Sequence, residues 1–147
     1  MIIVVAGPTG VGKTRLSVEL AKRYNAEVIN ADSMQVYKEL NIGTAKVTEK
    51  EKENIPHHLF DIKNPDELYT VYDYQKDLRN ILDNNKNKNY IIVGGTGLYI
   101  KAGLYNYEFS DDTDYNTYDD KSNLELYNLV KEKYPNLKIF LTHFREE

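Results

Sequence analysis

The stretch Gly7-Pro8-Thr9-Gly10-Val11-Gly12-Lys13-Thr14 constrains this chain more than any other feature. It fits the pattern G-x-x-x-x-G-K-[ST] in full, with the apolar residues 2–6 before it and a helical pattern after it. Glycines let successive backbone N–H groups point inward at an anion, and the following helix adds the positive end of its dipole. We expect Lys13 to reach the outer phosphate and the Thr14 hydroxyl to hold a Mg²⁺ ion. The stretch therefore predicts a phosphate or pyrophosphate site, against the alternative of a turn that merely closes a sheet.

The composition limits the class of protein. A length of 147 residues corresponds to about one domain, and the absence of cysteine excludes disulfides and thiolate metal sites. No apolar run approaches the roughly 20 residues that span a bilayer, and no basic leader precedes the first strand. We expect a cytoplasmic monomer with no membrane partner. The net charge of −4 argues against general binding to the nucleic-acid backbone, although it leaves room for a local basic groove.

Apolar runs alternate with helical patterns along the chain, which predicts an α/β fold with a parallel sheet flanked by helices. Together with the phosphate-loop motif, this indicates a P-loop NTPase-like sheet. Buried strands are predicted at residues 2–6, which we place innermost, and at residues 27–31, 90–93 and 137–142. Amphipathic helices are predicted over residues 14–24 and 69–84, after the glycine-rich turn at residues 94–99, and from the capping box of Ser122 and Glu125 to about residue 133. The tyrosines of the 69–84 helix are expected to serve packing.

One core domain is predicted over residues 1–147, with an acidic segment at residues 106–121. Five aspartates stand there, at positions 111, 112, 114, 119 and 120, among few apolar residues. Such a composition is typical of a flexible linker or a shortened insertion. The spacing does not match a calcium-binding loop, so a cation site is disfavoured.

The adjacent residues His57 and His58 raise the question of a metal site. Neighbouring side chains point in different directions, and no further ligand stands at a recognised spacing. A structural or hydrogen-bonding pair in a loop is the better interpretation.

Two strand ends are expected to face the phosphate loop. Asp32-Ser33-Met34-Gln35 follows the predicted strand at residues 27–31, and Gly94-Gly95-Thr96-Gly97-Leu98-Tyr99 follows the strand at residues 90–93. In open α/β sheets, ligands bind outside the carboxyl ends of the strands. From the residues alone, Asp32 has three open interpretations: a catalytic acid or base, a helix cap, and an outer ligand of Mg²⁺.

Taken in order, five motifs resemble those of the tRNA dimethylallyltransferases, also called tRNA isopentenyltransferases. They are the phosphate loop, Ala31-Asp32-Ser33-Met34-Gln35-Val36-Tyr37, Ile42-Gly43-Thr44-Ala45-Lys46, Pro56-His57-His58-Leu59 and Ile92-Val93-Gly94-Gly95-Thr96-Gly97-Leu98-Tyr99. The resemblance covers roughly residues 1–105, and residues 137–142 look like a later core strand of the family.

The resemblance implies an enzyme that transfers a dimethylallyl group from dimethylallyl diphosphate to the exocyclic amine of the adenine next to the anticodon in tRNA. The loop would then hold the pyrophosphate of the donor, with Lys13, Thr14 and Mg²⁺ stabilising its charge as it leaves. By the same matching, Asp32 accepts the proton of the amine, and Thr96 contacts substrate at the reaction centre. Ser33, Met34 and Gln35 would touch the target nucleotide, together with Asp32 and Thr96.

The chain also departs from the family pattern. The Arg-rich helical part that holds the anticodon arm is not recognisable in 147 residues, so tRNA binding is expected to be weakened. Three alternatives stay open: prenyl transfer to free AMP, a small P-loop kinase that uses ATP, and an inactive remnant that binds diphosphates.

Overall fold

The computed structural model describes residues 1–109 and 121–136, which belong to two units considered separately. The first unit is Met1–Phe109, and the second is Ser110–Glu147. The predicted strand at residues 137–142 and most of the predicted acidic linker lie outside the described residues. The predictions of that strand, of the linker and of a single core domain therefore stay predictions.

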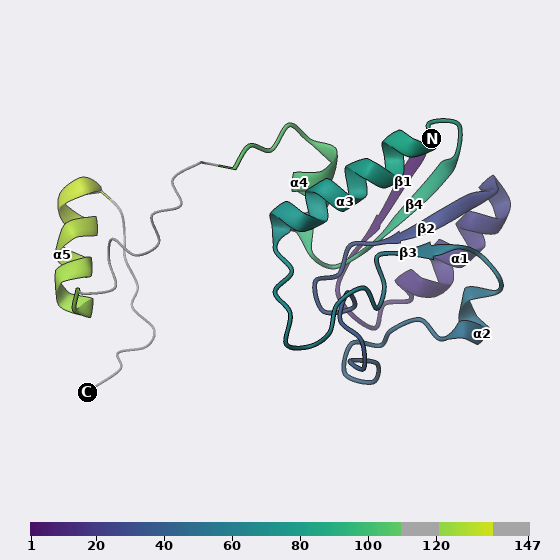
Figure 1. The fold of residues 1–147 in the computed structure, drawn as a ribbon, viewed down its shortest axis with the longest axis horizontal. Helices are drawn as coiled ribbons and strands as arrows, with labels where there is room; N and C mark the ends of the chain where they lie inside the picture. The colour runs from purple at the N-terminus through teal and green to yellow at the C-terminus, as the bar shows by residue number, and fades with distance from the viewer. Residues whose placement is uncertain (110–120, 137–147) are drawn as a thin grey trace. The chain divides into compact units, whose positions relative to one another are not determined.

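A four-stranded parallel sheet forms the centre of the first unit, in the order β1-β4-β2-β3 (Figure 1). Its strands are β1 (Ile2–Ala6), β2 (Ala26–Asn30), β3 (His57–His58) and β4 (Asn89–Gly94). β4 pairs with β1 on one side, Val5 opposite Val93, and with β2 on the other, Ile29 opposite Ile92. Because all four strands are parallel, their carboxyl ends lie at one edge of the sheet, as the sequence predicts.

The prediction that residues 2–6 form the innermost strand is wrong for the sheet that the structure describes. There, β4 and β2 are the central strands, and β1 pairs with β4 alone. Ile2 and Val4 keep 45% and 41% of their surface exposed, whereas Ile29 and Ile92 are fully buried. A continuous apolar run indicates a strand able to be covered on both faces, but it carries no information on strand order.

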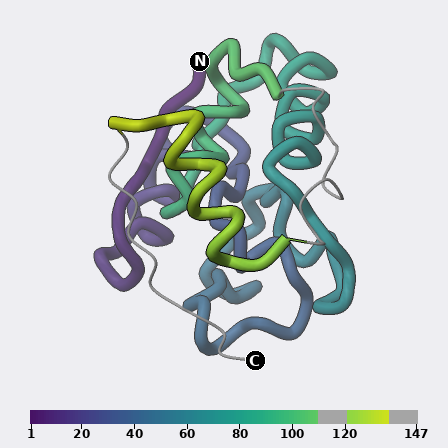
Figure 2. The backbone as a smooth tube through the Cα atoms, turned by 90° about the vertical axis from the view of Figure 1, so that its left-hand side faces the viewer, coloured from purple at the N-terminus to yellow at the C-terminus, as the bar shows by residue number. Residues whose placement is uncertain are grey.

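Helices cover both faces of this sheet. α1 (Lys13–Tyr24) packs on one face through Ala21, which joins a cluster with Val28 and Ile91. α3 (Val71–Asn84) and α4 (Gly97–Leu104) lie side by side on the other face (Figure 2). The result is a three-layer α/β arrangement. None of the described helices is long and apolar enough to cross a membrane.

The start of α3 follows a capping box. The Thr70 hydroxyl accepts a hydrogen bond from the backbone N–H of Asp73, and the Asp73 carboxylate accepts one from the N–H of Thr70. Tyr74 of α3 serves packing, as predicted: it is fully buried and stacks on Tyr99 of α4, with ring centroids 4.2 Å apart, whereas Tyr72 keeps 57% of its surface exposed. This contact fixes α4, and with it the turn between β4 and α4.

Two short elements, α2 (Glu49–Lys52) and β3, were not predicted, whereas the helix predicted after Ser122 is confirmed as α5 (Asn123–Lys133). α2 begins at a capping box of Thr48 and Glu51, and β3 consists of the two histidines that were expected in a loop. β3 exists because β2 offers it a free edge, which only the folded sheet supplies. In the second unit, α5 begins behind Ser122, whose hydroxyl accepts a hydrogen bond from Glu125 N–H at 3.3 Å.

Candidate functional site

The phosphate loop joins β1 to α1 through residues 7–12. Gly10 and Gly12 adopt φ values of 82° and 90°, a region that glycine enters without a steric cost. Gly12 is the N-cap of α1, no side chain caps the first turn, and no acidic residue stands in that turn. The first amides of α1 and the positive end of its dipole are therefore available to an anion.

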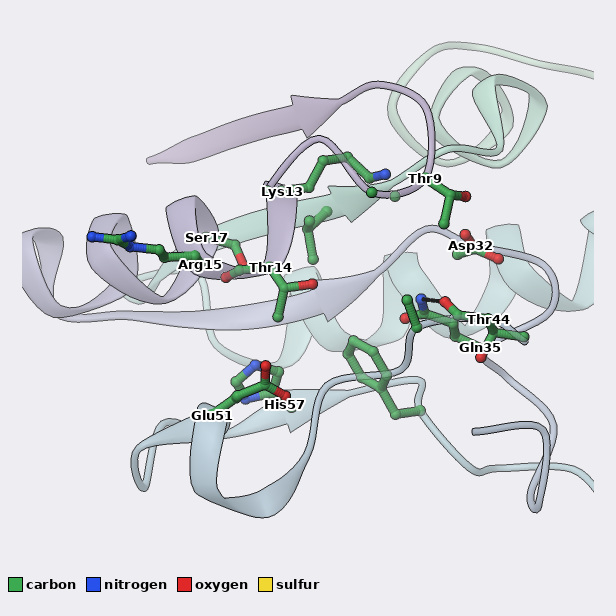
Figure 3. Close-up of a pocket in the computed structure, with 16 residues that line it drawn as sticks. Thr9, Lys13, Thr14, Arg15, Ser17, Asp32, Gln35, Thr44, Glu51 and His57 are labelled. Carbon is green, nitrogen blue, oxygen red and sulfur yellow. Dashed lines mark hydrogen bonds between the residues drawn. The ribbon is translucent and has the colours of Figure 1, made fainter. Parts of the chain in front are cut away.

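Lys13 and Thr14 begin α1 and line a cavity of about 290 Å³ (Figure 3). The Lys13 ammonium donates a hydrogen bond to the carbonyl of Pro8 at 2.7 Å. The ammonium therefore lies against the loop whose amides would bind an anion. Ser17, one turn further on, donates to the Thr14 carbonyl at 2.8 Å and is 1% exposed. Hydrogen bonds to the loop and to the first turn of α1 thus hold the side chains of Lys13 and Ser17 in place.

Asp32, two residues after the end of β2, lines the same cavity and lies beside Thr9 of the loop (Figure 3). Its backbone is held by Asn30, a fully buried amide that accepts from Asp32 N–H at 2.9 Å and donates to Asp32 C=O at 3.0 Å and to Leu59 C=O at 2.9 Å. The Asp32 carboxylate accepts one hydrogen bond, from Met34 N–H to Oδ1 at 3.0 Å. That bond closes a local turn rather than capping a helix, so the helix-cap interpretation does not hold.

The turns after β2 and β4 are joined. Thr96 donates its backbone N–H to Ala31 C=O at 3.0 Å, and its hydroxyl accepts from Ser33 N–H at 3.0 Å. Gly94 permits this close approach, since a Cβ atom there would lie 2.1 Å from the Ala31 carbonyl oxygen. Two predicted residues, Ser33 and Thr96, are therefore brought together by tertiary structure.

The side of the cavity opposite the phosphate loop, which we call the far wall, consists of Gln35, Thr44, Ala45, His57 and Phe60. Gln35 donates its side-chain N–H to the Thr44 carbonyl at 2.8 Å, as Figure 3 shows. The His57 ring meets the Phe60 ring edge to face, with centroids 5.5 Å apart. The far wall thus offers an aromatic surface beside amide and carbonyl groups.

The two adjacent histidines have separate structural roles. His57 Nδ1 lies 2.8 Å from Ile55 C=O, so Nδ1 carries the proton, and burial lowers the pKa of His57 below its ordinary value of 6.5. His58 Nε2 contacts the Glu27 carboxylate at 2.7 Å and ties β3 to β2. These contacts are those of a hydrogen-bonding pair.

The oxygen donors near the loop suit Mg²⁺. Thr14 and Asp32 line the same cavity and carry hydroxyl and carboxylate oxygens, the hard ligands that Mg²⁺ prefers. Within residues 1–109 and 121–136, no three or more His, Cys, Asp or Glu side chains gather into a metal cage. The hydroxyl of Thr14 and the carboxylate of Asp32 are the oxygen donors that would fit such an ion.

The predicted site residues divide into two sets. Those that line the cavity are Thr9, Gly10, Gly12, Lys13, Thr14, Asp32 and Gln35. Gly7, Pro8 and Val11 complete the loop, while Ser33, Met34 and Thr96 are not among the lining residues. Sequence reasoning assigned no role in the site to the lining residues Arg15, Ser17, Thr44, Ala45, Glu51, His57, Phe60, Val93 and Gly94. Thr44, Ala45, His57, Val93 and Gly94 belong to the motifs that carry the family resemblance, and this membership could have identified them as site residues.

Comparison with known proteins gives a consistent result. A family model described as IPP transferase matches residues 35–140. A tRNA dimethylallyltransferase of Staphylococcus aureus is 54% identical over 114 residues, which are 76% of this chain and 37% of that relative.

Solved structures resemble the fold as well. A tRNA isopentenylpyrophosphate transferase of Bacillus halodurans matches with a TM-score of 0.71 and 39% identity over 92% of this chain and 48% of that one. A eukaryotic dimethylallyltransferase acting on tRNA matches with a TM-score of 0.73 and 34% identity, over 91% and 36% of the two chains. The predicted P-loop NTPase-like fold is confirmed. The chain spans less than half the length of these relatives.

Proposed function

The chain belongs to the IPP transferase family, and on this premise we propose that it transfers a dimethylallyl group from dimethylallyl diphosphate to an adenine amine in tRNA, next to the anticodon. The observation that carries the proposal is the placement of the phosphate loop and Asp32 on one cavity. An anion site and a carboxylate that face each other suit a transfer in which one group leaves with negative charge while another loses a proton.

The loop side receives the leaving group. As the allylic C–O bond of the donor breaks, negative charge grows on the pyrophosphate, and the loop amides and the Lys13 ammonium stabilise it. Thr14 would hold a Mg²⁺ ion, which would supply further positive charge against the charge of the leaving group. The products are pyrophosphate and the alkylated adenine.

The Asp32 side receives the acceptor. The nitrogen of the amine forms the new C–N bond and gives up one proton, which the Asp32 carboxylate accepts. Because Met34 N–H engages only Oδ1, the other oxygen of the carboxylate is the one we assign to the proton. We propose that the nucleotide contacts Gln35, which lines the cavity. We propose further contacts to Ser33, Met34 and Thr96, which lie at the joined turns after β2 and β4. The cytoplasm, where tRNA is modified, is the proposed compartment; action as a monomer stays a prediction.

Incubation of the full chain with dimethylallyl diphosphate, Mg²⁺ and unmodified tRNA tests the proposal. We expect prenylated adenosine in digested tRNA, measured by mass spectrometry, and about 100-fold less or lower still with the Asp32→Asn variant. Folded chain that produces none from tRNA contradicts the proposal.

Parallel assays show which alternative function applies if the proposal fails. Product from AMP alone would indicate a free nucleotide acceptor, and ATP consumption dependent on a hydroxylated acceptor would indicate a kinase. Pyrophosphate binding without any product would indicate a binding remnant.

A further inference from the structure

We propose that Lys46 is a positioning residue that holds the far wall, and thereby the acceptor nucleotide, in register with the phosphate loop. Lys46 does not line the cavity, but its neighbours Thr44 and Ala45 do. The part that concerns the acceptor rests on the proposed function.

The Lys46 side chain is 3% exposed. Its ammonium donates hydrogen bonds to the Tyr37 carbonyl at 2.6 Å and to Asp61 Oδ1 at 2.6 Å. A buried ammonium is strongly unfavourable unless such partners are present, so the side chain stays where both acceptors are. Lys46 therefore fixes the distance between two segments that are far apart in sequence.

Three segments meet at this ammonium. The first, around Val36, runs beside the second, around Ile62: Asp61 N–H donates to Gln35 C=O at 3.3 Å, and Ile62 N–H donates to Val36 C=O at 2.8 Å. The third contains Lys46 itself. Its link to the first segment at the cavity is the Gln35 to Thr44 hydrogen bond, and its link to both segments behind the cavity is the Lys46 ammonium.

The far wall and the residues next to it in the chain need such support. Ala45, Leu59 and Asp61 have φ values of 48°, 62° and 54°, a left-handed conformation that residues with a side chain rarely adopt. Tertiary contacts must therefore hold these residues. Two of the three are the immediate neighbour and the ionic partner of Lys46. Loss of the ammonium should let the far wall relax while the glycine-based phosphate loop keeps its shape.

The test compares Lys46→Met, which keeps the length of the side chain without its charge, with Lys63→Met. Lys63 is the matched control because it stands beside the same segments in a partly exposed ion pair with Glu67. In the full chain, we expect hydrogen exchange at the Lys46 and Ile62 amides to accelerate by about 10-fold or more in Lys46→Met only. Inorganic pyrophosphate should bind both variants within about twofold of the unaltered chain.

The kinetic arm separates positioning from general support. We expect Lys46→Met to raise the KM for tRNA by about 10- to 100-fold, with the KM for dimethylallyl diphosphate unchanged, and Lys46→Arg to recover part of the loss. Equal losses for tRNA and donor, or exchange no faster than in Lys63→Met, would overturn the inference.

Two further outcomes also test the role of Lys46: a Lys46→Met variant that does not fold, and an unaltered chain that is inactive on tRNA. If Lys46→Met does not fold, Asp61→Asn, which keeps an acceptor oxygen without the charge, replaces it with the same expectations at smaller size. If the unaltered chain prenylates no tRNA, the proposed function fails, and the exchange and pyrophosphate measurements alone decide whether Lys46 holds the far wall.

Discussion

The phosphate loop and the far wall bound the same cavity, yet they hold their backbones by different means. In the loop, the residues with positive φ are Gly10 and Gly12. In the far wall and its supports they include Ala45 and Leu59, where a left-handed conformation costs roughly 1–2 kcal/mol per residue. The loop needs little beyond its own sequence and α1, whereas the far wall depends on contacts between distant segments.

This difference shows that the phosphate loop holds its conformation locally, whereas the residues around Asp32 and the far wall depend on contacts between distant segments. Asn30 reaches Leu59, Lys46 reaches Asp61, and Thr96 reaches Ser33, and all three contacts lie on the side of Asp32 and the far wall. A change in the phosphate loop should therefore act on the bound anion. A change in the far wall should spread to several residues.

The largest expected effect is that of Asp32→Asn. Asparagine keeps an oxygen for the Met34 N–H but cannot accept the proton of the amine. We expect prenyl transfer to fall by about 10²- to 10⁴-fold, with pyrophosphate affinity nearly unchanged. Single-turnover rates and calorimetry measure the two quantities. A variant as fast as the unaltered chain would remove Asp32 from the chemistry and leave the two walls without the proposed division of roles.

The next largest effect is that of Lys13→Ala, which removes one donor to the leaving pyrophosphate. We expect kcat to fall by about 10²- to 10³-fold, together with weaker pyrophosphate binding. Lys22→Ala is the control, because Lys22 stands on the same helix in an exposed ion pair with Glu53. Equal losses in both variants would indicate damage to α1 rather than a contact with the anion.

A pair of backbone substitutions tests the contrast directly. Gly10→Ala places a side chain at φ 82°, and we expect it to lower the free energy of unfolding by about 1–2 kcal/mol. Ala45→Gly relieves a similar cost but gives up about 0.5–1 kcal/mol of chain entropy, so its net effect should stay within about 1 kcal/mol of zero. Urea unfolding measures both. A large loss of stability in Ala45→Gly would show that the Ala45 methyl group, rather than the backbone, matters to the far wall.

The smallest effect concerns pH. Burial lowers the pKa of His57 in the folded chain below the value of 6.5, so the unfolded chain binds the proton more readily. This contribution to stability is fully present above pH 6.5 and is lost as pH falls through the folded pKa. We expect the urea midpoint to decline below pH 6.5, and less so in His57→Gln. Hydrogen exchange should show the far wall, rather than the phosphate loop, opening first. An identical decline in His57→Gln would assign the pH response to other groups.

Much of the fold followed from local patterns. The helices α1, α3 and α5 lie within two residues of their predicted bounds, because amphipathic spacing and the capping boxes of Thr70 and Ser122 act within a few residues. The edge position of β1 and the existence of β3 did not follow, since strand order depends on which apolar edges meet in three dimensions. For the same reason, the predicted Gly43-Thr44-Ala45-Lys46 motif gave no hint that Lys46 would be buried.

By itself, the sequence determined the phosphate loop. Two glycines, a lysine and a threonine at fixed spacing between a strand and a helix specify a conformation that needs no distant partner. Only the tertiary structure decided what faces that loop. It joined Thr96 to Ser33 and built the far wall from residues 35, 44, 45, 57 and 60. Those contacts arise from side chains tens of residues apart, whose pairing no local pattern encodes.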